Sequence, residues 1–167
     1  MNTNYSHAPS DYTCPFCLML KRAARGITLA SDTEIVCQIE HATAFIGMRQ
    51  WPSNAGDTII IPNQHYENIF DLPEELAIPI QEMAKAIALA MKDVYRCSGI
   101  SLRQHNEPAG NQDVWHYHIH VTPRYLGDEF YAKYTTTAEI MTPEERAKHA
   151  AILREQVTNH LQKECSE

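Results

Sequence analysis

Three histidines within five residues constrain the fold of this chain more than any other feature of its sequence. His116, His118 and His120 alternate with Tyr117 and Ile119, and a β-strand places every second side chain on the same face. The pattern therefore predicts a half-buried strand with three imidazoles on one face and apolar side chains on the other. At about 3.3 Å per residue, the outer two histidines lie about 13 Å apart, too far to bind one ion together. We infer that the three residues serve two different purposes.

The segments around this strand predict an α+β domain. Residues 71–74 and 142–145 carry capping-box patterns, and each precedes a segment with apolar side chains at three- and four-residue spacing. These segments are expected to form two amphipathic helices. The order strands, helix, strands, helix predicts an antiparallel sheet of about five strands with helices on one face. The β-prone runs are 34–39, 43–46, 58–62, 100–103 and 114–122.

The chain is expected to form one domain with loose ends. No period of 20 to 50 residues repeats, and no low-complexity tract separates two composition regimes. The predicted parts are a flexible arm over 1–12 and a single domain over 13–167, in which 14–128 carries the motifs and 129–167 forms a tail and helix.

The charge of the chain argues against one large class of partner. There are 14 Lys and Arg residues against 21 Asp and Glu residues, which leaves a formal net charge of −7. Such a surface repels a phosphate polyanion, so no nucleic-acid groove is expected. No apolar run approaches the ~20 residues of a membrane span, and the first ten residues lack the charged start and apolar centre of a signal peptide. We expect a soluble, cytoplasmic protein that does not enter a membrane.

The five cysteines are an odd number without a secretion signal, which argues against a disulfide framework. Cys14 and Cys17 form a C-x-x-C pair that can give two thiolates to a soft divalent ion, which is half of a tetrahedral site. They open a run of helix formers that stops at Gly26, without the βαβ setting of a thioredoxin-like redox pair. His65 and one end of the histidine alternation are candidates to complete a zinc site. A catalytic zinc held by two neighbouring histidines of the strand is the alternative.

Four sequence blocks, in this order, carry a resemblance to a known family. They are C-P-F-C at 14–17, I-I-P-N-Q-H at 60–65 followed by N-I-F-D-L at 68–72, R-Q-H-N-E-P-A-G at 103–110 leading to Gln112, and H-Y-H-I-H-V-T-P-R at 116–124. Together they resemble the histidine triad (HIT) superfamily of nucleotide hydrolases and transferases. The resemblance covers about residues 14–128, and it implies a nucleotide substrate and a symmetric homodimer.

By this resemblance, His118 would be the nucleophile that attacks the α-phosphorus of a nucleotide. The result would be a nucleotidyl-histidine intermediate, which water then hydrolyses; a neutral imidazole near pH 7 has the free lone pair that this requires. His120 would donate to the phosphate oxygens. The remaining residues expected to contact the substrate are Asn106, Gln112 and Phe45.

The resemblance also implies a structural metal. In the branch of the family that carries the C-x-x-C pair, His116 would complete a zinc site with Cys14, Cys17 and His65. A closed site of four protein ligands has no open position for water, so the ion would hold the fold rather than catalyse.

Several positions depart from the family pattern. Gly47 stands where many members have an aspartate for the ribose hydroxyls, and the loop 48–54 is longer by about two residues. Asp57 replaces a histidine that is common before the following strand. Asp113 replaces a serine or threonine that, in the phosphoramidase branch, is placed to protonate the leaving group. These changes bear on the nucleoside and on the leaving group.

Three other functions compete with this interpretation. The substitutions at Gly47, Asp57 and Asp113 favour a nucleotide-binding or scaffold protein that has lost turnover. A catalytic-zinc hydrolase would use His116 and His118 on its ion. A DNA-deadenylating relative is disfavoured by the net charge of −7. The aromatic-rich segment 125–134 is expected either to pack on its own domain or to form a lip over the site of a partner.

Overall fold

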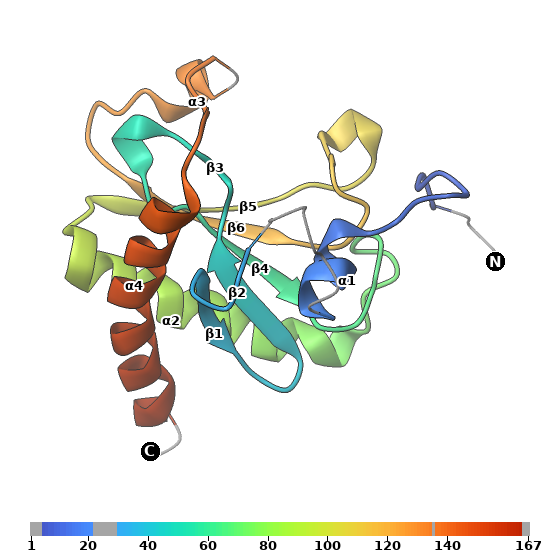
Figure 1. Ribbon diagram of the computed structural model, residues 1–167, viewed down its shortest axis with the longest axis horizontal. Coiled ribbons are helices and arrows are strands. Elements are labelled where there is room, and N and C mark those ends of the chain that lie inside the picture. The colour runs from blue at the N-terminus through green and yellow to red at the C-terminus, as the bar shows by residue number, and fades with distance from the viewer. Residues whose placement is uncertain (1–4, 22–29, 135, 165–167) are drawn as a thin grey trace.

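The computed structural model describes residues 5–21, 30–134 and 136–164, with side chains up to 161. Within them, a five-stranded antiparallel sheet has the order β1-β2-β4-β6-β5 (Figure 1). This confirms the predicted α+β fold and the antiparallel pairing. The strands are β1 (Ile35–Gln38), β2 (Ala42–Ile46), β4 (Thr58–Pro62), β5 (Gly99–Gln104) and β6 (Ile119–Arg124).

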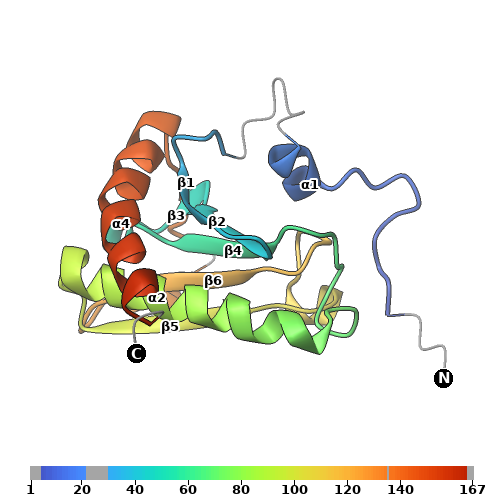
Figure 2. The same cartoon turned by 90° about the horizontal axis from the view of Figure 1, so that it is seen from below.

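Two long helices, α2 (Ala77–Tyr95) and α4 (Pro143–Glu164), pack against each other and against one face of the sheet (Figure 2). The predicted apolar stripe of α2 is confirmed, because its spaced apolar side chains are the buried ones. The short α1 (Pro15–Leu20) lies on the opposite face, where Phe16 packs with Phe45 and Ile61. The rest of the predicted first helix, up to Gly26, lies mostly outside the described residues.

Of the two predicted capping boxes, the one at α4 forms and the one at α2 does not. At α4, Thr142 and Glu145 form the reciprocal capping box: the Thr142 N–H donates to Glu145 Oε2 at 3.0 Å, and the Glu145 N–H donates to Thr142 Oγ1 at 3.3 Å. At α2, the chain first makes a short 3₁₀ helix, Glu74–Leu76, so Asp71 does not cap the α-helix. Pro79 is accommodated in the first turn of α2, where its missing N–H has no helical partner.

Alternation in the strands divides the apolar side chains between two cores. On β2, Ala44 and Ile46 face α2 and α4, whereas Phe45 faces α1. On β6, Ile119 and Val121 belong to the core under the long helices. The odd and even positions of each strand therefore supply opposite faces of the sheet.

The histidine strand begins later than predicted. β6 starts at Ile119, where pairing with Ile60 of β4 also starts. The Tyr117 N–H donates to the Tyr66 carbonyl at 2.6 Å instead of to a neighbouring strand. One reason is that β4 ends at Pro62, which has no N–H to extend the ladder. Strand alternation nevertheless gives the correct result for Tyr117, which is buried in the core under the long helices.

A small second sheet joins the motif-bearing part of the chain to the tail. β3 (Arg49–Gln50) pairs with β7 (Glu139–Ile140), and the Met141 N–H donates to the Met48 carbonyl at 3.0 Å. Between the two, α3 (Phe130–Lys133) buries Phe130. The tail therefore packs on its own domain, which is the first of the two alternatives given for segment 125–134.

The described part of the predicted flexible arm is hydrogen-bonded to the domain. The buried Glu67 carboxylate accepts the Ser6 hydroxyl and the N–H groups of His7 and Ala8. The ring of Tyr5 lies against Phe70, with 4.5 Å between ring centroids. Residues 5–8 thus lie on the loop that follows β4, because a buried carboxylate requires donors and these residues provide them.

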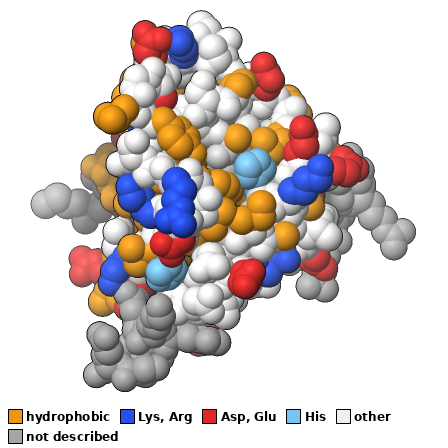
Figure 3. Space-filling model, turned by 90° about the vertical axis from the view of Figure 1, so that its left-hand side faces the viewer, with side chains coloured by type: hydrophobic (Ala, Val, Ile, Leu, Met, Phe, Trp, Pro, Cys, Tyr) orange, Lys and Arg blue, Asp and Glu red, His pale blue; other side chains and the backbone are white. Residues whose placement is uncertain are grey.

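Charged groups both join buried elements and cover the surface. The guanidinium of Arg146 on α4 donates to the carboxylate of Glu34, just before β1, at 2.5 Å, and both side chains are almost fully buried. Figure 3 shows a face on which apolar side chains are mixed with acidic and basic ones. Among the described residues, no helix is both long and apolar enough to cross a membrane.

Candidate functional site

A cavity of about 560 Å³ opens on the face of the sheet opposite α2 and α4. Its polar wall includes His105, His118 and His120, so two of the three alternating histidines share it. The wall beside α1 is apolar and includes Phe45, Phe16, Ile59 and Val114. The outer wall comes from β3 and from the tail, and includes Met48, Trp51, Tyr134, Ala138 and Ile140.

His118 is held in one orientation by the backbone. Its Nδ1 lies 2.7 Å from the His116 carbonyl oxygen, to which it must donate, because a carbonyl can only accept. In the neutral ring, Nε2 then carries the lone pair. Burial is the main cause that lowers the pKa of His118 from its ordinary 6.5 to about 4, and His120 lowers the pKa further. At pH 7 the ring is therefore neutral, and its Nε2 carries a free lone pair.

His120 lies beside His118 and is hydrogen-bonded to a buried acid, Asp57. The ring centroids of His118 and His120 are 5.3 Å apart. The Nδ1 of His120 lies 2.8 Å from Asp57 Oδ2, and the Asp57 side chain is 1% exposed. The departure from the family pattern at Asp57 thus brings a carboxylate, in place of an imidazole, against the last histidine of the alternation.

Asp57 also contacts a buried arginine. Arg103 Nη2 lies 3.4 Å from Asp57 Oδ1. The guanidinium carbon of Arg103 lies 4.6 Å from the ring centroid of Tyr134, 5.0 Å from Phe130 and 5.2 Å from Trp51. Its Nε and Nη1 have no hydrogen-bond partner, and these aromatic rings surround the group. Aromatic faces attract a cation, which accounts for an arginine held in such a place.

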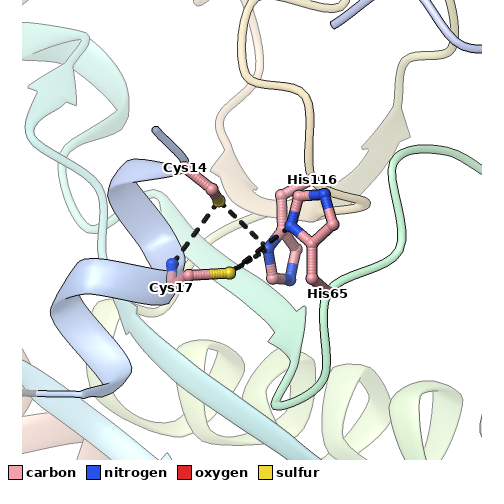
Figure 4. A group of neighbouring side chains, drawn as sticks. All are labelled: Cys14, Cys17, His65 and His116. Atoms are coloured by element: carbon pink, nitrogen blue, oxygen red, sulfur yellow. Dashed lines mark hydrogen bonds between the residues drawn. The ribbon is translucent and has the colours of Figure 1, made fainter. Parts of the chain in front are cut away.

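The four predicted metal ligands lie together at the start of α1 (Figure 4). Cys14 is the residue before the helix, and its sulfur accepts the Cys17 N–H at 3.4 Å. One ligand atom from each of Cys14, Cys17, His65 and His116 lies within 4.8 Å of the others. Segments far apart in the sequence therefore meet at one point.

The geometry of this cluster fits a tetrahedral ion. Zn–S bonds of about 2.3 Å and Zn–N bonds of about 2.0–2.1 Å place the ligand atoms roughly 3.5 Å apart. The Cys14 Sγ–His116 Nδ1 distance is 3.3 Å, Cys17 Sγ–His65 Nδ1 is 3.4 Å, and Cys17 Sγ–His116 Nδ1 is 3.7 Å. His116 Nε2 lies 3.0 Å from the Pro62 carbonyl oxygen, a second contact that directs Nδ1 toward the sulfurs.

Two residues predicted to contact the substrate point elsewhere in this structure. The Asn106 side chain accepts the Ile69 N–H at 2.9 Å. Gln112 is buried, and its amide donates to the Val114 carbonyl at 3.0 Å. Both side chains hold the loops beside the site, and neither lines the cavity, whereas Phe45 does. The substrate roles of Asn106 and Gln112 remain predictions.

The sequence interpretation missed His105, one residue before Asn106. His105 lines the cavity, and its Nδ1 donates to the Gly110 carbonyl at 2.6 Å. Its Nε2 is buried without a hydrogen-bond partner. The alternation of sides along β5 and the loop after it could have indicated this residue, because neighbouring residues in an extended segment point to opposite sides.

Asp113 lies at the mouth of the site. Its Oδ1 is 4.0 Å from His118 Nε2, and its side chain is 79% exposed. The charge of Asp113 raises the pKa of His118, but burial outweighs this effect. A carboxylate therefore lies next to the free nitrogen of His118, at the position where the family often has a hydroxyl.

The five-stranded antiparallel sheet, with a cavity that contains neighbouring histidines on one face, defines an α+β protein with a histidine-lined site. The family model described as the HIT domain matches residues 28–127, more than half of the chain. The protein belongs to the HIT family. Its α1 and its tail, with β7 and α4, lie outside the matched range.

Individual relatives agree with this assignment. Over 130 residues the chain is 34% identical to Protein hit from Bacillus subtilis, covering 77% of this chain and 86% of the relative. It is 28% identical over 127 residues to adenosine 5′-monophosphoramidase HNT1 from Saccharomyces cerevisiae, covering 74% and 72%. The crystal structure of a zinc-bound histidine triad family protein from Mycobacterium smegmatis has the same fold. That likeness has a TM-score of 0.69 at 23% identity, and covers 93% of this chain and 98% of the other.

Proposed function

We propose that this protein is a nucleotide hydrolase or transferase that cleaves at the α-phosphate of a nucleoside-phosphate derivative through a nucleotidyl-His118 intermediate. The observation that carries the proposal is the state of His118: its Nδ1 is committed to a backbone carbonyl, and its neutral Nε2 is beside a cavity. The yeast relative is named an adenosine 5′-monophosphoramidase, an activity that belongs to the same kind of chemistry.

The reaction then has two steps. In the first, the Nε2 lone pair of His118 forms a bond to the α-phosphorus, the bond to the leaving group breaks, and the leaving group departs with the electron pair and takes a proton. In the second, a water oxygen bonds to the phosphorus, the phosphorus–nitrogen bond breaks, and the lone pair returns to His118 as the water loses a proton. His120 supports both steps by donating to the phosphate oxygens.

The metal is proposed to be a structural zinc bound by Cys14, Cys17, His65 and His116. The ion would stabilise the fold by joining these segments, since four protein ligands leave no position for water. The orientation of His116 supports this role over a catalytic ion shared with His118. His116 Nδ1 faces the sulfurs, whereas His118 Nδ1 is occupied by a carbonyl.

The test is intact-protein mass spectrometry of the trapped intermediate, with nucleoside phosphoramidates and dinucleoside polyphosphates as substrates. The wild type should gain the mass of one nucleoside monophosphoryl group. His118→Asn keeps the size of the side chain but has no basic nitrogen, so it should form no adduct and lose at least roughly 10⁴-fold in turnover.

The matched control is His41→Asn, a change of the same kind at an exposed histidine between β1 and β2. It should form the adduct and turn over at the wild-type rate. The proposal is wrong if His118→Asn turns over like the wild type. A wild type that binds nucleotides but hydrolyses none of the panel would instead identify a binding protein, the alternative that the substitutions at Gly47, Asp57 and Asp113 raise.

A further inference from the structure

Asp57 is the most confined acid next to the cavity. Its backbone is fixed by the buried side chain of Gln50, which accepts the Asp57 N–H at 2.8 Å and donates to the Asp57 carbonyl at 2.9 Å. Its carboxylate has two differently occupied oxygens. Oδ1 accepts from Thr122 Oγ1 and Arg103 Nη2, and Oδ2 faces His120 Nδ1 at 2.8 Å.

This arrangement determines how His120 is used. A carboxylate only accepts, so the contact requires a proton on His120 Nδ1. The two ring nitrogens point in different directions, and His120 lines the cavity while Asp57 is buried beneath it. Nε2 therefore points to the cavity, where a bound phosphate would lie. When Nε2 also carries a proton, the ring is positively charged, and the carboxylate of Asp57 stabilises that charge.

We propose that Asp57 is a positioning residue for the reaction: it keeps a proton on Nδ1 of His120, directs Nε2 to the transferred phosphate, and balances the charge of the ring. This inference rests on the proposed function, because it assigns how His120 supports the phosphate. It replaces the interpretation of Asp57 as a change that weakens the site.

Arg103 extends the same network to the tail. Its contact with Asp57 Oδ1 leaves Oδ2 for His120, and its guanidinium is enclosed by Trp51, Phe130 and Tyr134. Phe130 and Tyr134 follow the part of the chain that the HIT domain matches. The tail thus supports the orientation of a histidine in the cavity indirectly, through the guanidinium of Arg103 and the carboxylate of Asp57.

The informative variant is Asp57→Asn, which has the same size without the charge. Thr122 and Arg103 both donate to the Oδ1 side, so the amide oxygen should take that side, and the amide NH₂ should face His120. An NH₂ group can only donate, so His120 Nδ1 should accept from it, and the ring proton should lie on Nε2. His120 Nε2 can then still donate to the phosphate, but the Asp57 charge that supports it is gone. Because this donor is weakened rather than removed, turnover should fall about 10- to 100-fold.

Three measurements test this. Nitrogen-15 NMR of histidine-labelled protein should show His120 protonated at Nδ1 in the wild type and unprotonated there in Asp57→Asn. In a double-mutant cycle, Asp57→Asn should reduce turnover by less than about 3-fold when His120 is already Asn, since its effect passes through that ring. Glu34→Gln is the matched control: it removes another buried carboxylate paired with a buried arginine, away from the cavity, so it should lower stability but not turnover.

The proposal is overturned if wild-type His120 carries no proton on Nδ1, if the loss in Asp57→Asn is the same with and without His120, or if Glu34→Gln loses as much turnover. The NMR measurement needs neither substrate nor a variant that folds well. If the wild type turns over and only the Asp57 results fail, this inference alone is wrong. If the wild type shows no turnover or adduct, the proposed function is wrong, and the NMR result still decides the role of Asp57.

Discussion

At the scale of single residues, the site depends on histidines in which one ring nitrogen is hydrogen-bonded to a backbone carbonyl and the other is left free. His118 donates from Nδ1 to a carbonyl, and His116 donates from Nε2 to another, so the two rings present opposite nitrogens to their surroundings. One ring therefore faces the cavity with Nε2, and the other faces the cysteines with Nδ1. The spacing of the alternating histidines predicts two different purposes, and the opposite orientations of these two rings support that prediction.

Gly56, which precedes Asp57, is expected to tolerate no side chain. Its φ is +104°, and a Cβ there would lie 2.6 Å from the Tyr95 ring. Tyr95 hydroxyl and His149 Nδ1 are 2.9 Å apart, so the ring cannot move without losing that contact. Gly56→Ala should lower the free energy of unfolding by roughly 2–4 kcal/mol, from overpacking and backbone strain together.

Denaturant unfolding measures this cost, and Gly110→Ala is its control. A Cβ at Gly110 would meet nothing within 4 Å, and its backbone has no positive φ. That variant should unfold within about 0.5 kcal/mol of the wild type. Equal stabilities for the two variants would contradict the packing of Gly56 against α2.

At the scale of elements, the turn after β6 determines where the tail goes. Asp128 accepts two bonds from Arg124, at 2.7 Å each, and also the N–H groups of Tyr125 and Phe130 at 2.9 and 3.1 Å. Asn54, at the end of the short 3₁₀ helix Pro52–Asn54 after β3, donates to the same carboxylate at 2.8 Å. One acid thus joins the end of β6, the start of α3 and the loop that carries Trp51.

Asp128→Asn should weaken this turn in a pH-dependent way. The hydrogen bonds from Arg124 are the main cause that holds the pKa of Asp128 far below its ordinary value. The stabilisation is therefore fully present above the unfolded pKa, about 3.9, and is lost as the pH falls through the lower folded pKa. At pH 7 the variant should lose about 1.5–3 kcal/mol, the range for hydrogen bonds to a charged group.

Urea unfolding at pH 7 and at successively lower pH should show this difference shrinking below about pH 4. The neighbouring Glu129→Gln is the control, because the ion pair of Glu129 with Lys133 is exposed at both ends. Its removal should leave the urea midpoint close to that of the wild type at every pH, because an exposed ion pair contributes little to stability. A difference at Asp128 that does not depend on pH would mean that shape, not charge, is what the turn requires.

At the scale of the whole molecule, the Cys₂His₂ cluster joins parts of the chain that the sheet does not. Cys14 and Cys17 lie on the face opposite the long helices, His65 follows β4, and His116 precedes β6. Burial and the nearby Cys14 sulfur raise the pKa of Cys17 to about 11. A divalent cation would offset the cost of two neighbouring thiolates. The homodimer and the cytoplasmic location remain predictions.

Zinc removal should therefore destabilise the protein and leave His118, the proposed nucleophile, chemically unchanged. Metal analysis should find about one zinc per chain, in keeping with the four ligands. At a zinc concentration 100-fold above Kd, binding adds about 2.7 kcal/mol, which corresponds to roughly 5–11 °C in Tm for a chain of this size. A chelator should lower the Tm of the wild type by about this amount and that of Cys14→Ser by much less.

Cys37→Ser is the control for this experiment. Cys37 is a half-buried cysteine on β1 and does not belong to the cluster. The variant should keep its zinc and its response to chelation. Protein purified without chelators that contains no zinc would rule out the proposed ion.

The sequence by itself determined the features that depend on local patterns. The three- and four-residue spacing of Ile80, Met83 and Ile87 indicates one face of a helix, and a helix with one apolar face has to bury it. The capping box at Thr142 lies within four residues, so its geometry follows from the sequence alone. Cys14, Cys17 and His65 could be named as candidate ligands because their residue types favour the same ion, whereas the choice of His116 came from the resemblance to the HIT family.

Only the tertiary structure decided the contacts between segments far apart in the chain. The pairing of β3 with β7 joins two-residue strands about 90 positions apart, too short to leave a periodic pattern. Asp57 is 63 positions from His120, and its value to that ring depends on Gln50 and Arg103 holding it in place. A sequence shows that an acid replaces a histidine. Packing in three dimensions decides which donors surround the buried acid, and therefore whether the acid weakens the site or orients it.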